Sequence, residues 1–272
     1  MAKDMRESKE RKMKRQGMVI GAVILGCSFN FCRGSIDSWV ELQSEIASDT
    51  EPGDAFGNSV AACGDVAIVG APEDDDMAMS AGAAYIFNRQ GTAWIEGQKL
   101  TASDSVWGDL FGWSVAISGD TALIGTPGGI DEKEYAGTAY LFQRDGDTWS
   151  QAQKLFDAQG ADDDQFGWSV AIDGDCALVG APENNSKGSA YLYKRDGASW
   201  TLQQKLIPAD AGGDFGYAVS ISGNTAVVGS RTNSNSNGTR AGAVYVYTRE
   251  GVTWTLEQKL IASEDAAGGY LV

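Results

Sequence analysis

The sequence repeats one unit of about 50 residues four times, and this repetition limits the fold more than any other feature. Each copy begins with Phe-Gly, at residues 56, 111, 166 and 215. The second copy reads FGWSVAISGDTALIGTP and then, after a loop, GTAYLFQRDGDTWSQAQKL; the third reads FGWSVAIDGDCALVGAP and GSAYLYKRDGASWTLQQKL. Repeats of this length are supersecondary units that bury their apolar residues against their neighbours. The chain is therefore expected to fold as a series of similar, mutually packed units.

Each copy contains four strand-like runs. In the second copy, large and small uncharged residues alternate over residues 111–117, which predicts an inner strand that is buried on both faces. A Ser-Gly-Asp turn leads into the second run, residues 122–125, and an Asp-Gly hairpin joins the third run, 139–142, to the fourth, 149–155. The Gln and Lys residues of the fourth run suit an exposed edge strand.

Four strands per unit, with the innermost buried and the outermost polar, predict an all-β chain of β-propeller blades, each a four-stranded antiparallel sheet. The missing 3.6-residue period excludes a helical solenoid, and a sandwich would not repeat one four-stranded unit so closely. An additional outer strand is expected at residues 39–43. The four repeats are assigned to residues 56–110, 111–165, 166–214 and 215–269, approximately.

Residues that recur in every copy are assigned a structural role. They include an aromatic-glycine pair at the start of each unit and a Trp that follows an Arg by five residues, so that the guanidinium can stack on the indole. These residues are Phe56, Gly57, Phe111, Gly112, Phe166, Gly167, Phe215, Gly216, Trp94, Trp149, Trp200 and Trp254.

These residues resemble the FG-GAP repeat, the blade unit of integrin α-subunit propellers, over roughly residues 38–270. Besides Phe-Gly, the chain has Gly-Ala-Pro at 70–72 and 180–182 and a near match at 125–127, whereas 229–231 departs from the motif. Propellers of this family commonly have seven blades, so the resemblance favours a fragment of a larger ring. A compact four-bladed ring and an assembly of arcs are the alternatives.

The resemblance raises the question of calcium, because many integrin-type blades carry a DxDxDGxxD loop between their first two strands. The corresponding turns here are residues 63–65, 118–120, 173–175 and 222–224, and each has at most two carboxylates. Calcium prefers six to eight oxygen ligands. We therefore expect no cofactor and do not assign the family's calcium sites to this chain.

The N-terminus has the layout of an export signal. Residues 1–16 contain seven Lys/Arg and three Asp/Glu, and an apolar stretch follows at 18–26 that is too short to span a bilayer comfortably. Cys27 ends a lipobox-like sequence and is a candidate for lipidation, and cleavage before Ser35 is the alternative. Residues 1–34 are thus assigned as a signal peptide or lipoprotein signal and residues 35–272 as the propeller. We expect a secreted protein or a cell-surface or outer-membrane lipoprotein; a basic cytosolic tail is the competing interpretation.

Charge and composition exclude several functions. The chain has no histidine, which removes the usual catalytic triads and imidazole metal sites, and its cysteines lack zinc-ligand spacing. Cys63 and Cys176 fall at non-equivalent positions and are expected to be free thiols. A net charge of −16 argues against phosphate-mediated nucleic-acid binding and fits a cationic partner.

Sequence variation concentrates in the loops between strands two and three and in those between blades. In this topology both kinds of loop share one face, as binding surfaces on repeated scaffolds commonly do. An Asp before a Phe-Gly can instead cap the turn. The acidic runs 74–76 and 162–164 are weak metal candidates. The candidate ligand-binding residues are Glu73, Asp74, Asp75, Asp76, Asp104, Asp109, Asp131, Glu132, Asp162, Asp163, Asp164, Glu183 and Asn184.

Three functions remain open. The favoured one is a non-enzymatic exported or cell-surface module for integrin-like adhesion or protein–protein interaction through one loop face. A carbohydrate-binding propeller would need exposed aromatic residues in the variable loops, where Trp107 and Tyr135 qualify. A glycosidase needs only two carboxylates, but the acids here recur with the repeat whereas an active site should be unique.

The expected partners are a protein or glycan at the cell surface, with membrane contact only through a lipid anchor. Inner strand edges left unpaired after Val272 also predict self-association.

Overall fold

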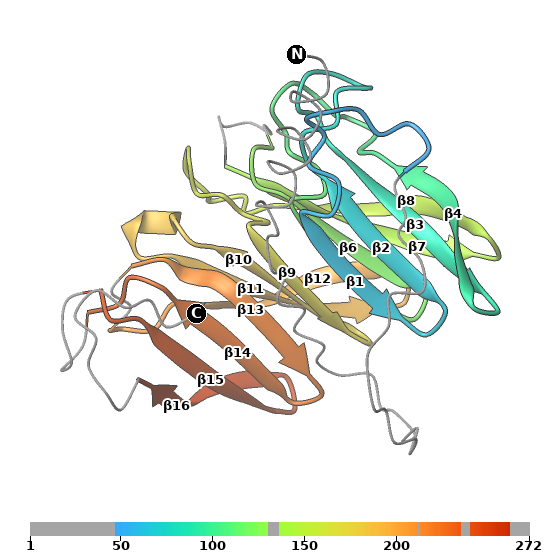
Figure 1. Cartoon of the computed structure of the whole chain (residues 1–272). Helices are drawn as coiled ribbons and strands as arrows, with labels where there is room; N and C mark the ends of the chain where they lie inside the picture. The colour runs from blue at the N-terminus through green and yellow to red at the C-terminus, as the bar shows by residue number, and fades with distance from the viewer. Residues whose placement is uncertain (1–46, 130–135, 211–212, 235–239, 262–272) are drawn as a thin grey trace, which may run out of the picture.

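The computed structural model describes residues 47–129, 136–210, 213–234 and 240–261, which form four four-stranded antiparallel sheets (Figure 1). Blade 1 contains β1 (Ser59–Cys63), β2 (Val66–Ala71), β3 (Ala83–Gln90) and β4 (Ala93–Leu100). Blade 2 contains β5 (Ser114–Ser118), β6 (Thr121–Thr126), β7 (Thr138–Asp145) and β8 (Thr148–Leu155). Blade 3 contains β9 (Ser169–Asp173), β10 (Cys176–Ala181), β11 (Ser189–Asp196) and β12 (Ser199–Leu206), with a 3-10 turn, η1, at Asn184–Ser186. Blade 4 contains β13 (Phe215–Ser222), β14 (Thr225–Ser230), β15 (Ala243–Glu250) and β16 (Thr253–Leu260).

Within each blade the strands pair in chain order, so the sheet is a simple up-and-down meander. Glycines with positive φ close the hairpins, as in Gly119 (φ 57°) between β5 and β6 and Gly146 (φ 60°) between β7 and β8. This arrangement confirms the predicted all-β propeller fold with four-stranded antiparallel blades. The expected strand at 39–43 lies outside the described residues.

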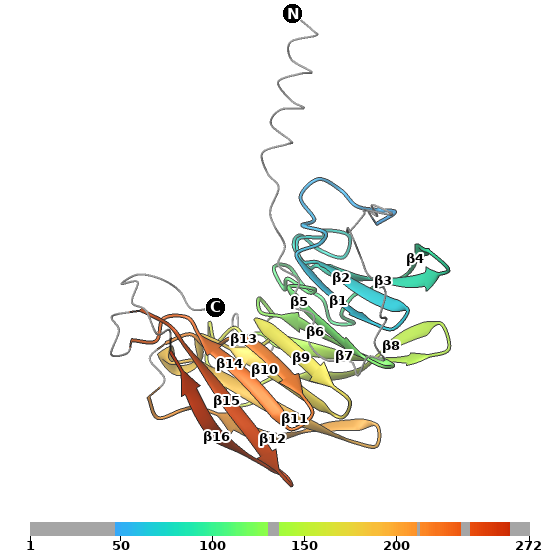
Figure 2. The ribbon, with the colours of Figure 1, turned by 60° about the horizontal axis from the view of Figure 1, so that its bottom comes forward.

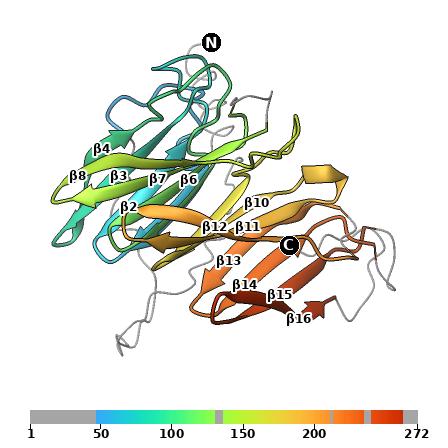
Figure 3. The same ribbon diagram turned by 180° about the vertical axis from the view of Figure 1, so that it is seen from behind.

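The blades follow one another along the molecule, with inner strands β1, β5, β9 and β13 side by side, and blades 1 and 4 lie at opposite ends (Figures 2 and 3). We call the face of a blade that packs on the following blade its forward face, and the opposite face its rear face. Each seam between blades joins an aliphatic forward face to an aromatic rear face.

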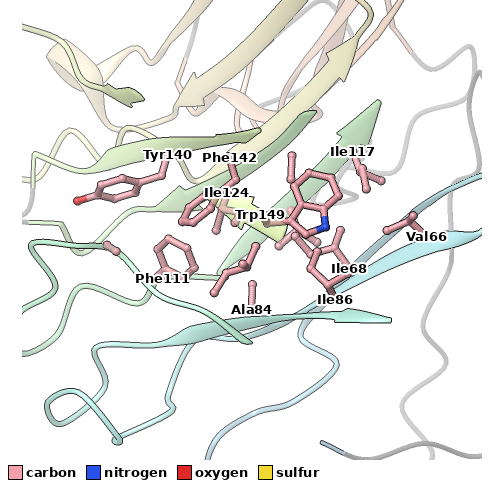
Figure 4. Close-up of a cluster of buried hydrophobic side chains, with 14 residues drawn as sticks. Val66, Ile68, Ala84, Ile86, Phe111, Ile117, Ile124, Tyr140, Phe142 and Trp149 are labelled. Atoms are coloured by element: carbon pink, nitrogen blue, oxygen red, sulfur yellow. The ribbon is translucent and has the colours of Figure 1, made fainter. Parts of the chain in front are cut away.

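The seam between blades 1 and 2 shows how these faces fit (Figure 4). Ile68 and Ile86 project from blade 1 onto Phe111, Phe142 and Trp149 of blade 2, and all five side chains are buried. Burial of one such side chain contributes about 1.5–3 kcal/mol, so the packing of blade on blade stabilises the fold. The next two seams repeat this arrangement.

A glutamine in the outer strand of blades 1, 2 and 3 ties each of them to the next blade at the periphery. Gln98 donates its side-chain N–H to the carbonyl of Trp149 and accepts the Trp149 N–H, both at 2.8 Å. Gln153 with Trp200 and Gln204 with Trp254 repeat this pair of hydrogen bonds. The polar outer strand therefore uses its glutamine for packing between blades.

The repeated glycines are required where two blades approach most closely. Gly167 has a φ of +90°, and a Cβ built on Gly125 of blade 2 would lie 2.0 Å from the carbonyl oxygen of Gly167 in blade 3. Gly70 and Gly180 meet the following Phe-Gly in the same way. The Phe-Gly of one blade and the Gly of the preceding blade therefore form one contact.

The expected alternation over residues 111–117 was wrong at its beginning. β5 starts at Ser114, after Gly112 with its positive φ, and Ser114 and Ala116 on the predicted small face are half-buried. Phe111 packs in the rear face, whereas the half-buried Trp113 stacks on Trp168 of the next blade, with ring centroids 4.8 Å apart. Trp168 in turn lies 5.5 Å from Tyr217, so these rings form a row across three blades.

Two further predictions concern the Arg–Trp pairs and the cysteines. Each Arg–Trp pair is directly opposite across a hairpin, and the guanidinium of Arg249 lies 5.3 Å from the Trp254 ring centroid. Neither Cys63 nor Cys176 forms a disulfide, as predicted.

Candidate functional site

The variable loops of neighbouring blades gather on one face, because backbone hydrogen bonds join them. The N–H of Phe111, at the end of one inter-blade loop, donates to the carbonyl of Ala81 in a loop of blade 1, and equivalent bonds join blades 2 and 3 and blades 3 and 4. We call this surface the loop face. It comprises the described parts of residues 72–82, 101–110, 127–137, 156–165, 182–188, 207–214 and 231–242.

One set of acids on this face is neutralised by a lysine from the outer strand of the same blade. In blade 2, Lys154 donates to Asp104 at 2.8 Å, and the hydroxyl of Tyr140 donates to the same carboxylate at 2.8 Å. Partial burial acts to raise the pKa of Asp104, but these hydrogen bonds outweigh it and hold the pKa below its usual value. Equivalent Asp–Lys–Tyr groups occur at Asp49–Lys99–Tyr85, Asp157–Lys205–Tyr191 and Asp210–Lys259–Tyr245.

Blade 1 contains an enlarged version of this group. The ammonium of Lys99 lies 3.0 Å from Asp49, 2.8 Å from Asp74 and 2.6 Å from Asp76. Asp75 points elsewhere and accepts the N–H of Ser80 at 2.5 Å. An internal cation therefore occupies the acidic run 74–76. Among the residues that the structure describes, no group of three or more Asp, Glu or Cys side chains is arranged so that it could hold a metal ion. The expected independence of calcium stays a prediction.

A second set of acids caps the inter-blade loops. Asp54, Asp109 and Asp164 are buried, and each carboxylate accepts the backbone N–H of the residue three positions earlier, at 2.6–2.7 Å. Asp164 also accepts a hydrogen bond from the side chain of Asn184, which is itself buried. These contacts give Asp109, Asp164 and Asn184 a structural role at the base of the loop face. In blade 4, Asp214 instead pairs with Arg231 at 2.9 Å.

A third set of acids points outward. Glu73, Asp162, Asp163 and Glu183 are exposed, and their carboxylates have no hydrogen bond or ion pair with any residue that the structure describes. They are the predicted ligand-binding residues that remain available on the surface. Asp131 and Glu132 lie outside the described residues, as do Cys27 and Tyr135.

Exposed apolar side chains also occur on the loop face, at the junction of blades 1 and 2. Trp107 is 52% exposed, and Met77 and Met79 are each 60% exposed. The two loops that carry them are joined by a hydrogen bond from the N–H of Gly108 to the carbonyl of Met79, at 3.0 Å. We call Met77, Met79, Val106 and Trp107 the loop-face apolar patch. Sequence reasoning identified Trp107 alone, because no pattern along the chain links the methionines to residues about 30 positions later.

A family model described as the FG-GAP repeat matches residues 39–87, 94–142, 149–193 and 200–247. The last three matches each start in the outer strand of one blade, at β4, β8 or β12, and end in the third strand of the next. No curated protein matches the chain significantly. Each of these three matched units therefore spans a seam between two blades.

Proposed function

The chain belongs to the FG-GAP repeat family, and from this premise we propose that it is a non-enzymatic, exported module that binds a partner protein through the loop face. FG-GAP propellers generally mediate protein interactions and are typically non-catalytic. More specifically, we propose integrin-like adhesion, in which the chain acts at the cell surface and binds its partner through the loop face.

The single observation that carries the proposal is the loop-face apolar patch. An exposed tryptophan flanked by two exposed methionines is unusual on a soluble surface and is typical of interaction sites. Tryptophan is enriched among residues that dominate binding energy, and methionine adapts to partners of different shape. The patch lies on two loops that are held by hydrogen bonds, so a partner would bind without ordering them.

The charges on this face favour a basic partner. The lysines of the Asp–Lys–Tyr groups are paired internally, whereas Glu73, Asp162, Asp163 and Glu183 extend outward. With a net charge of −16, the chain would attract a partner that surrounds an apolar residue with Lys or Arg, and salt would weaken their association.

The proposal that the chain is exported rests on the N-terminal basic and apolar runs, which lie outside the described residues. Cleavage before Cys27 with lipidation, or cleavage before Ser35, would place the propeller outside the cytoplasm. Within the described ranges, no helix is both long and apolar enough to cross a membrane.

Carbohydrate binding is the second candidate function, and the exposed indole of Trp107 favours it. Aromatic rings offer a flat apolar surface for the C–H face of a sugar. A carboxylate-based glycosidase receives less support, because most of the candidate acids on the loop face have internal partners.

The two candidates can be separated with one pair of variants. Immobilised protein would be incubated with a surface-protein extract of the source cells and, separately, with a glycan array. The proposal expects a captured protein whose affinity falls roughly 30-fold or more in Trp107→Ala, the equivalent of about 2 kcal/mol for a central tryptophan. Ile95→Ala removes another exposed apolar side chain, from β4, and should bind like the wild type. Glycan binding that needs Trp107, without a captured protein, would replace the proposal with the carbohydrate alternative.

A further inference from the structure

The forward face of blade 4 is built like the forward faces of blades 1–3 but is not covered by any described residue in the same way. In blade 3, Leu178, Ala190, Leu192 and Leu206 occupy this face and are at most 2% exposed. The equivalent residues of blade 4 are Val227, Val244, Val246 and Leu260. Leu260 is 41% exposed, and the three valines are half-buried.

Blade 4 also has a glycine at the position where the other blades require one. They require it because the backbone of the following blade approaches closely there. A Cβ on Gly180 would lie 2.0 Å from the carbonyl oxygen of Gly216 in the next blade. Gly229 occupies the same position in blade 4, yet the nearest atom to its Cβ would be the side chain of Ala218 in its own blade, at 3.5 Å. The residue is suited to a close approach that no described part of the chain makes.

The inner half of the rear face of blade 1 likewise lacks the packing that the equivalent surface has in the other blades. Gly57 has a φ of +92°, and a Cβ built on it would have no atom within 4 Å, whereas a Cβ on Gly112 would lie 2.2 Å from the Ala83 carbonyl oxygen of the preceding blade. Val60 is 47% exposed, against 7% for its counterpart Val115. Within the residues that the structure describes, the Phe-Gly segment of blade 1 thus has no preceding blade to receive it, unlike those of blades 2–4.

We propose that two copies of this chain associate head to tail, with the forward face of blade 4 in one copy on the inner rear face of blade 1 in the other. Gly229 would then meet the carbonyl of Gly57 as Gly125 meets Gly167. The two surfaces lie at opposite ends of the molecule (Figure 2), so one copy cannot bring its own surfaces together. The occupant is a second copy because the same two surface types already form three seams within the chain.

Such an interface is heterologous, since different surfaces of the two copies meet. It therefore predicts a specific pattern of mutational effects. A substitution at either surface alone should abolish association, but two chains altered at opposite surfaces still share one intact pair. A symmetric contact between two blade 4 faces would behave differently, because a change in blade 1 would leave it untouched.

The test uses the full chain with Val246→Asp at the blade 4 surface or Val60→Asp at the blade 1 surface. Both side chains are partly or largely exposed, so the charge enters without disrupting a closed seam. The matched controls are Leu256→Asp and Ile95→Asp. Leu256 and its counterpart Leu202 are both exposed, although blade 3 has a neighbour on each side, so this position lies outside any seam. Ile95 and its counterpart Ser150 are likewise exposed. Thermal melts of all four variants would verify folding.

Sedimentation equilibrium over a hundredfold concentration range provides the measurement. The wild type and both controls should show a mass that rises above the 28.7 kDa of one copy, whereas each surface variant alone should remain at that mass. An equimolar mixture of Val60→Asp and Val246→Asp should form a one-to-one pair. Trp107→Ala should associate like the wild type, which separates this interface from the loop face. A monomeric wild type, or a Val60→Asp chain that still self-associates, would overturn the proposal.

Discussion

The ammonium group of Lys99 lies 2.8 Å from the carboxylate of Asp74, whose side chain is only 3% exposed. Lys99 of β4 lies directly opposite Tyr85 of β3, and Asp74 lies in the loop between β2 and β3. The hydroxyl of Tyr85 is 2.8 Å from the same Asp74 carboxylate. A lysine thus supplies the positive charge that the acidic run 74–76 needs. The outward carboxylates of the loop face are left as the groups that can meet a partner.

Calcium is expected to have little effect on stability. Asp74 and Asp76 already share the charge of Lys99, and the turns at 63–65, 118–120, 173–175 and 222–224 offer too few carboxylates. Thermal melts with excess chelator and with millimolar calcium should nearly coincide. A midpoint that rises strongly with calcium would show that a tight site forms in the folded protein.

Removal of the lysine from an Asp–Lys–Tyr group should destabilise the fold. Lys205→Met leaves Asp157, a largely buried carboxylate, with the hydroxyl of Tyr191 but without its cation, which should cost about 1–3 kcal/mol. Lys194→Met is the matched control, because Lys194 lies 3.6 Å from the exposed Asp175 and should contribute under 1 kcal/mol. Urea unfolding at pH 7 would measure both values, and equal losses would contradict the structural role of the group.

The same groups should make the protein sensitive to acid. Burial opposes ionisation of Asp104 and Asp157, yet hydrogen bonds from the neighbouring lysine and tyrosine hold both pKa values below the usual value, as they do for Asp49; for Asp210, Lys259 is the main cause. Because the unfolded carboxyls bind protons first, this stabilisation is complete above about pH 5 and is lost as pH falls below about 4 through the folded pKa values.

Urea midpoints should therefore agree at pH 7 and pH 5 and fall at pH 3. The Asp157→Asn variant should start from a lower midpoint and lose less between pH 5 and pH 3 than the wild type. An unchanged pH dependence in this variant would show that other carboxyls determine the acid response.

Glycine should be essential at the seams and dispensable at the last blade. Gly125→Ala would place a methyl group against the Gly167 carbonyl, and the two backbones would have to separate, at a cost of about 1–3 kcal/mol or more. Gly229→Ala meets only ordinary contact with Ala218 and should change the stability of the single chain by less than about 1 kcal/mol. Denaturation at low protein concentration, where association is absent, would compare them. Comparable losses would mean that the seams do not need this close approach.

Export should remove or modify the N-terminus. The basic run in residues 1–16 and the apolar run at 18–26 predict cleavage before Cys27 with lipidation, or before Ser35. Mass spectrometry of protein from the native cells should find no intact residues 1–26. A full-length species in the cytosol would contradict the proposed location.

The sequence by itself determined the blade. Alternating residues, Gly-containing turns and a polar fourth run act over a few positions, and four copies of the same pattern specify one supersecondary unit that must pack on itself. For this reason the four-stranded meander, the structural Phe-Gly and Trp residues and the absence of a disulfide at Cys63 and Cys176 were predictable. The start of β5 at Ser114 was not, because the alternation of large and small residues continues through Gly112, whose backbone has a positive φ.

Only the tertiary structure decided what the loop acids do. Asp104 and Asp109 are five residues apart in one loop, yet Asp104 pairs with Lys154 from a strand 50 residues away, whereas Asp109 caps its own turn. Likewise, Trp107 adjoins Met79 because a hydrogen bond crosses from one blade to the next. Strand formation depends on neighbours along the chain and can be read from their pattern, but charge pairing and surface patches depend on distances that arise only after the blades have packed.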